Sequence, residues 1–168
     1  FDAYLATLPE AARLPYLPGV AQLDRSWREA HVAADAAALD PQAVAALSAD
    51  RLAGARLAVH PSARWHWFEA LPVYSIWCAQ RDDTAPPDLA WGGEGALLLR
   101  RGGQVCRHAL GLGGCVLLEA CRSGATLHAA AEQALDADPT LALATTFAML
   151  LDSSAFSSLT FSATQGIP

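Results

Sequence analysis

The stretch from residue 95 to residue 135 constrains the fold most strongly. Residues 96–101 form an apolar run that ends in two arginines, and residues 104–110 return as a second extended segment. The pair Gly102-Gly103 between them accepts the positive φ angles that a two-residue hairpin turn requires. The sequence therefore predicts a β-hairpin at this point of the chain.

Two helices are predicted directly after this hairpin. The first runs from Gly113 to Cys121, and Ser123-Gly124-Ala125 provides its stop. The second begins at Thr126 and reaches Leu135. A hairpin followed by a helix-turn-helix is the outline of a winged helix, which binds either nucleic acid or a peptide.

Composition limits the choice between these two ligands. The chain has 168 residues, of which 53% are hydrophobic and 17% charged, so it can bury a core. No window approaches a membrane-spanning apolar run, and we expect a cytoplasmic protein. The net charge of −6 argues against duplex DNA, because such proteins need cations to replace phosphate counterions. The predicted second helix also lacks Arg and Lys.

The expected fold class is α+β, with a helical N-terminal part packed on a small C-terminal winged-helix-like domain. We expect a partner-binding domain over residues 1–85 and a peptide-binding domain over residues 88–168, because Pro86-Pro87 resembles a linker. Other expected elements are helices from Pro18 to about Ala34, Gln42 to Leu47, Val73 to Gln80 and Thr140 to Leu151, the last of them buried, and strands Arg56–His60 and Ser157–Ser162.

Four polar residues follow a 4-3-4 spacing along the long first helix: Asp24, Arg28, His31 and Asp35. This spacing places them within a narrow arc. They form either a partner-facing or acid/base patch, or an ordinary helix ladder in which Asp35 satisfies His31. The cluster Trp65, Trp67 and Phe68 is either a recognition patch or a packed strand end. As the partner interface we select Asp24, Arg28, His31, Trp65 and Trp67.

The sequence offers no catalytic signature, and we expect neither a catalytic residue nor a metal or cofactor in this chain. It lacks the nucleophile elbow, the phosphate loop and the zinc-protease motif. Its four cysteines form no CxxC pair and are expected to be free thiols. Cys106 and His108 share a strand face, but two ligands without a third are a weak metal signal.

The hairpin instead suggests a peptide site. Either Leu97-Leu98-Leu99 or Val105-Cys106-Arg107 is expected to be a sheet edge, whose unpaired backbone groups an extended peptide can join. Its arginines would favour an acidic peptide, unless the first domain covers this edge. The candidate peptide-binding residues are Leu97, Leu98, Leu99, Arg100, Arg101, Val105 and Arg107.

Three short motifs occur in order along the chain: residues 16–24 (YLPGVAQLD) before the long helix, His60-Pro61-Ser62, and residues 72–77 (PVYSIW). With them the chain resembles the partner proteins of multinuclear non-haem iron oxidative enzymes, from about Leu5 to Phe156. This family includes the HvfC/BufC-type proteins and MbnC of methanobactin biosynthesis. HvfC/BufC-type members usually carry an extra N-terminal helical domain. This chain begins where that domain would end, so it resembles the shorter MbnC type or a fragment.

The resemblance implies a non-catalytic subunit in the biosynthesis of a ribosomally made, modified peptide. Such a subunit forms a heterodimer with the iron enzyme and holds the leader of the precursor peptide, partly by strand addition. The enzyme then oxidises cysteines of the core peptide, in the MbnC type to an oxazolone and thioamide that bind copper. The iron would belong to the partner. Two alternatives are a winged-helix DNA-binding regulator and a small metal or redox protein that uses Cys106, His108 and the other thiols.

Overall fold

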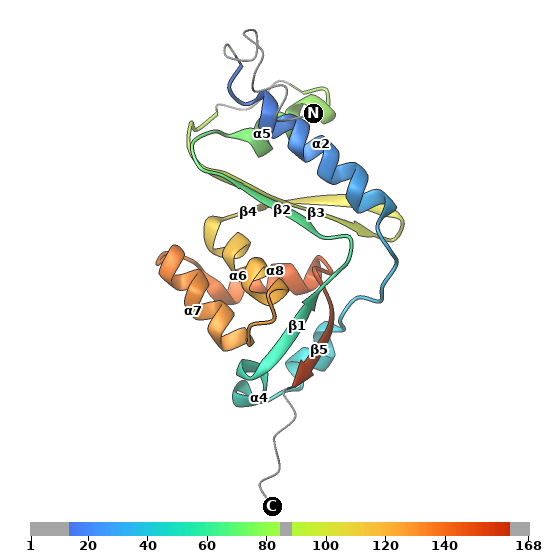
Figure 1. Cartoon of the computed structure of the whole chain (residues 1–168), viewed down its shortest axis with the longest axis vertical. Helices are drawn as coiled ribbons and strands as arrows, with labels where there is room; N and C mark the ends of the chain where they lie inside the picture. Colours follow the sequence, from blue (N-terminus) through green and yellow to red (C-terminus); the bar gives the residue numbers. More distant parts are fainter. Residues whose placement is uncertain (1–13, 85–88, 162–168) are drawn as a thin grey trace, which may run out of the picture. The chain divides into compact units, whose positions relative to one another are not determined.

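The computed structural model describes residues 14–84 and 89–161 and has an α+β fold (Figure 1). The expected linker at Pro86-Pro87 lies outside the described residues. In chain order the elements are α2 (Leu17–Val32), α3 (Pro41–Ala45), α4 (Ala49–Ala53), β1 (Ala55–Val59), β2 (Arg64–Phe68), α5 (Val73–Arg81), β3 (Glu94–Arg101), β4 (Gln104–Leu110), α6 (Leu112–Arg122), α7 (Leu127–Ala137), α8 (Leu143–Asp152) and β5 (Phe156–Phe161).

The chain divides into two compact units, and each is built from separate segments. The first unit combines the described residues up to Ala33 with Arg64–Gly111. The second combines Ala34–Ala63 with the described residues from Leu112 onward. The sequence instead predicts two contiguous domains, one on either side of the expected linker. In the structure the hairpin belongs to the first unit and the helix pair α6–α7 to the second.

The first unit is an antiparallel three-stranded sheet in the order β2-β3-β4, with α2 and α5 packed on one face (Figure 1). The residues that meet there form the core of this unit. They include Leu23 from α2, Trp77 from α5 and Leu98 from β3, all exposed by 1% or less. The apolar side chains of the two helices and the sheet therefore exclude water from one continuous layer.

The predicted hairpin is confirmed. Gly102 and Gly103 have φ angles of 58° and 81°, values that side chains with a Cβ rarely adopt. They join β3 and β4 with Arg101 opposite Gln104. This register fixes the face on which every side chain of β4 lies.

Helix α2 is shorter than predicted at its C-terminal end. A proline lies in its first turn, as expected, but Ala33 already has an extended backbone. The helix therefore ends at Val32, and Asp35 falls outside both the helix and the first unit. The prediction that four polar residues share one helix face is therefore wrong for the last of them, Asp35.

The second unit pairs β1 with β5 in an antiparallel sheet and contains the helix pair α6–α7 (Figure 1). Gly124 ends the connection after α6 with a φ of 82°, and the Thr126 side chain accepts a hydrogen bond from the Ala129 N–H. These are the stop and cap that the sequence predicts.

The His60-Pro61-Ser62 motif has a structural role in this second unit. His60 is 6% exposed. Its Nδ1 lies 2.8 Å from Ser62 Oγ, and its Nε2 lies 3.1 Å from the Ala36 carbonyl oxygen. Both ring nitrogens thus have partners, and the side chain ties the segment before α3 to the end of β1.

Helix α8 is not the buried helix that its apolar composition predicts. It begins at Leu143, and only Leu150 is buried among its residues. One helix face supplies its contacts, while side chains such as Ala144 and Ala148 are exposed. No helix among residues 14–84 and 89–161 is both long and apolar enough to cross a bilayer.

Candidate functional site

The outer edge of β4 is the candidate site, because the described residues pair no further strand with it. A two-residue loop makes Arg101 and Gln104 a hydrogen-bonded pair, and such pairs alternate along an antiparallel ladder. Residues 104, 106, 108 and 110 therefore direct their backbone groups toward β3. Val105, Arg107 and Ala109 direct their N–H and C=O groups away from it, along the open edge.

The helix-covered face of this edge is formed by β4 and α5. Val105 packs against the core of the first unit, and Arg107 lies opposite Leu98 on the same face. Tyr74 and Cys78 of α5 lie close enough to Arg107 for its positive charge to influence their pKa values. A strand added at this edge would place every second side chain beside these residues.

Burial sets the protonation of this face. It raises the pKa of the Tyr74 phenol far above its ordinary value, and the neighbouring Cys78 adds to this rise. Burial also raises the pKa of the Cys78 thiol, although its hydrogen bond with Tyr74 works in the opposite direction. Both groups are therefore neutral at pH 7, and the charges that act on this face come from Arg107, its carboxylate partner and Glu94.

Asp82 is that partner, and it lies just beyond the C-terminal end of α5. Arg107 Nη2 donates to Asp82 Oδ1 at 2.7 Å and to Oδ2 at 2.5 Å. The side chains of Arg107 and Asp82 are 34% and 45% exposed. This contact raises the pKa of the Arg107 guanidinium, so Arg107 carries a full charge at the open edge.

The structure separates the candidate peptide-binding residues into two groups. Leu97, Leu98 and Leu99 are fully buried in β3, and β3 is the central strand. The alternative that placed the sheet edge at Leu97-Leu98-Leu99 is therefore wrong, because its ladder is already paired with β4 and, up to Leu98, with β2. The alternative at Val105-Cys106-Arg107 has the edge position that strand addition requires.

The two arginines before the turn also differ. The Arg100 guanidinium donates to the carbonyl oxygens of His31 and Ala33, the latter at 2.7 Å, so it holds the end of α2. Arg101 is exposed at the hairpin tip. It contributes, after burial, to lowering the pKa of His108, which lies on the same face of the sheet as Arg101, opposite to the helices.

The candidate partner-interface residues of α2 have diverse contacts. Asp24 accepts hydrogen bonds from Trp77 Nε1 at 2.9 Å and from Arg81 at 3.3 Å. The Arg81 guanidinium also lies over the rings of Trp27 and Trp77, at 4.5 and 4.9 Å from their centroids. Asp24 thus organises the contact between α2 and α5.

Arg28 and His31 are the exposed members of this set. The His31 ring stacks on Trp27 with 5.7 Å between centroids and an interplanar angle of 1°. His31 therefore has an aromatic partner in place of the expected Asp35.

Trp65 and Trp67 are half-buried in β2. They alternate with Arg64, His66 and Phe68, so they lie on the sheet face opposite to α2. Trp67 also packs closely against Gly93, where an added Cβ would lie 2.5 Å from its ring. The packed strand end is thus observed, whereas a contact with a partner stays a prediction.

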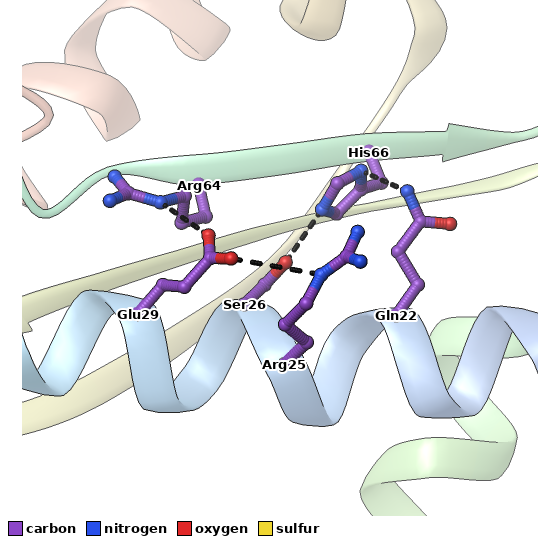
Figure 2. Close-up of polar contacts among 6 residues, drawn as sticks. All are labelled: Gln22, Arg25, Ser26, Glu29, Arg64 and His66. Atoms are coloured by element: carbon purple, nitrogen blue, oxygen red, sulfur yellow. Dashed lines mark hydrogen bonds and ion pairs between the residues drawn. The ribbon is translucent and has the colours of Figure 1, made fainter. Parts of the chain in front are cut away.

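A polar seam between α2 and β2 was missed by sequence reasoning (Figure 2). His66 Nδ1 lies 2.8 Å from Gln22 Nε2, and His66 Nε2 lies 2.7 Å from Ser26 Oγ. Because the amide nitrogen can only donate, Nδ1 accepts and Nε2–H donates to the serine. Beside them Glu29 accepts from Arg64 Nε at 3.0 Å. The four-residue spacing of Gln22 and Ser26 was the available signal, but their partner lies far along the chain.

An apolar hollow of about 470 Å³ opens beside this seam, within the first unit. It lies between the start of α2 and the connection from β2 to α5, and its lining includes Pro15, Pro18, Phe68 and Leu71. Glu69 is the one charged residue of this lining. Such a site suits an apolar side chain.

The cysteines are free in the described residues, and no group of three or more potential metal ligands occurs there. Burial raises the pKa of Cys115 to about 12 and that of Cys121 to about 11. Both α6 thiols are therefore protonated and poorly nucleophilic at pH 7.

The helix pair α6–α7 presents few cations. The side chain of His128 lies 3.5 Å from Glu132, and both are more than 60% exposed. Arg122 is paired with Glu119 at 2.6 Å. This surface offers little to a phosphate backbone.

Comparison with known proteins identifies no relative, because no family model, no curated protein and no solved structure matches the sequence.

Proposed function

We propose that this chain is a non-catalytic adaptor subunit that binds the leader of a ribosomally made precursor peptide. The observation that carries the proposal is the outward-facing backbone of Val105, Arg107 and Ala109 along the outer edge of β4, with which the described residues pair no strand. A peptide in extended conformation would add to the sheet there, with backbone hydrogen bonds for affinity and alternate side chains for specificity. The central strand β3 then serves as the rigid support.

The identity of the partner rests on the family resemblance. In this proposal an iron-dependent oxidative enzyme binds the adaptor as a heterodimer and oxidises the core cysteines of the peptide, as in methanobactin-type oxazolone and thioamide formation. The iron belongs to that enzyme. Arg28 and His31, which are exposed on α2, are the best candidates for its contact surface, together with Asp24, Trp65 and Trp67.

The test is co-expression with an iron-dependent oxidative enzyme of the resembled kind and its precursor peptide, followed by size-exclusion chromatography with light scattering. We expect a one-to-one complex that takes up the peptide. In Ala109→Pro the outward N–H is lost while the ladder to β3 is kept, so the enzyme should stay bound and the peptide should be lost. The matched control Ala109→Val keeps the N–H and should retain both. A wild-type chain that ignores both partners would refute the proposal.

The alternative, a winged-helix DNA-binding regulator, predicts salt-sensitive duplex binding. The winged-helix arrangement itself stays a prediction. The exposed His128–Glu132 pair on α7 leads us to expect no such binding, which a gel-shift titration at low salt would check.

A further inference from the structure

We infer that Asp82 pairs with Arg107 in the free protein and takes the place that an acidic side chain of the peptide fills when the peptide is bound. An acidic residue of the added strand would displace Asp82 and pair with Arg107. This inference rests on the proposed peptide-binding function and adds to it the chemistry that selects the peptide.

The position of Arg107 supports this role. Its backbone N–H and C=O face the open edge, and its side chain lies on the helix-covered face. A strand that pairs with the edge therefore brings a side chain of its own alongside the guanidinium, on the same face. One residue of β4 would thus bind both the backbone and the charge of the peptide.

The position of Asp82 makes it a replaceable partner. A carboxylate at the C-terminal end of a helix lies near the negative end of the helix dipole, which disfavours it. The adjacent cation Arg81 is turned toward Asp24 and two tryptophan rings. Arg107 provides the charge that offsets this cost, through a contact in which both side chains are about one-third to one-half exposed.

Such an exposed ion pair contributes little to the free energy of folding. Its exchange for an equivalent pair with the peptide therefore costs little free energy. In this inference the side chain of the added strand takes the place of Asp82 beside Arg107. An acidic side chain restores the ion pair, whereas a neutral one leaves Arg107 without a carboxylate, so peptides that lack an acidic residue at this register are disfavoured. Selection thus arises from the difference in binding free energy between an acidic peptide, which replaces the ion pair, and a neutral peptide, which does not.

The test uses an extended, fluorescently labelled peptide of alternating threonine and valine with one central glutamate, and its glutamine counterpart. Binding to the full chain is measured by fluorescence anisotropy. The wild type should prefer the glutamate peptide. Asp82→Asn should raise its affinity for that peptide roughly two- to fivefold, the value of an exposed pair, and leave the glutamine peptide less affected. Arg107→Gln should abolish the preference.

The control is Glu119→Gln, which breaks a more exposed Arg–carboxylate pair on α6 and should change neither affinity. Equal binding of both peptides by the wild type and by Asp82→Asn would overturn the inference and leave the peptide site intact. If no variant binds either peptide, both the inference and the proposed function fail. Self-association of Asp82→Asn without peptide, seen by light scattering, would make a second copy the occupant and also overturn it.

Discussion

The two edge strands of the three-stranded sheet are anchored in different ways. The side chains of β2 are held by α2: His66 is hydrogen-bonded through both ring nitrogens, and Arg64 is paired with Glu29 (Figure 2). The outward-facing part of β4 is tied to α5 by the partly exposed Arg107–Asp82 pair. One edge is therefore held by buried as well as exposed polar contacts, whereas the other has a partly exposed ion pair, which the proposed peptide would exchange for one of its own.

Both edges depend on the same central strand, and the largest effect should come from there. Leu98 of β3 is fully buried and lies opposite Arg64 on one side and Arg107 on the other. Leu98→Ala should lower the free energy of unfolding by about 2–5 kcal/mol, because a cavity remains in the core. Urea unfolding followed by tryptophan fluorescence measures this loss.

Val32→Ala is the control, since Val32 is 78% exposed. Its effect should stay within about 0.5 kcal/mol. A similar loss in both variants would show that the core described for the first unit is not its main source of stability.

The second-largest loss of stability is expected at the β2 edge of the sheet. His66→Phe keeps a ring in the seam but leaves Ser26, which is 2% exposed, and Gln22 without their nitrogen partners. We expect a loss of about 1–3 kcal/mol in the free energy of unfolding, the cost of unpaired buried polar groups. Denaturant titration by circular dichroism is the measurement.

Glu29→Gln tests the exposed half of the same seam. It removes the ion pairs of Glu29 with Arg25 and Arg64. The Glu29 side chain is 46% exposed. The loss should be below about 1 kcal/mol. If Glu29→Gln costs more than His66→Phe, the exposed charges and not the buried hydrogen bonds of His66 anchor β2.

Two proline substitutions test which backbone groups of β4 face outward. His108→Pro removes an N–H that points toward β3, whereas Ala109→Pro removes one that points away from it. His108→Pro should therefore cost about 0.5–1.5 kcal/mol more than Ala109→Pro, the net value of one ladder hydrogen bond. Parallel thermal and urea unfolding of the two variants measures the difference. Equal losses would mean that the edge at Ala109 is already paired.

The hairpin could be predicted from sequence because its signals are local. Gly102-Gly103 specifies the turn, and the alternation in β4 follows from the register that this turn sets. Helix ends were predicted to within a few residues for the same reason, since caps such as Thr126 act on their own helix. The alternation, however, could not show which of the two hairpin strands would be the edge.

What the sequence could not supply are pairings between distant segments. Residues 64–68 add a strand beside β3, and this third strand places Leu97 and Leu98 in the centre of the sheet. Asp24 finds its partners 53 and 57 residues further along the chain, in Trp77 and Arg81. The composition of α8 was misleading as well, because an apolar helix is buried only where another element covers it.

The smallest expected effect concerns the charges of β4. Burial and, after it, Arg101 lower the pKa of His108, so the folded state binds this proton at a lower pH than the unfolded chain, whose histidine titrates near pH 6.5. The stability contribution is therefore full above that pH and falls as the pH drops toward the lowered pKa. Arg101→Gln removes a repelling charge and raises the pKa of His108, so it should reduce the loss of stability between about pH 7 and pH 5. Urea unfolding at the two pH values measures this difference.

In a His108→Gln background the same Arg101 substitution should leave the pH dependence unchanged, because the responding group is gone. An equal effect in both backgrounds would assign the pH response to another group and remove Arg101 from the features that distinguish β4 from β2.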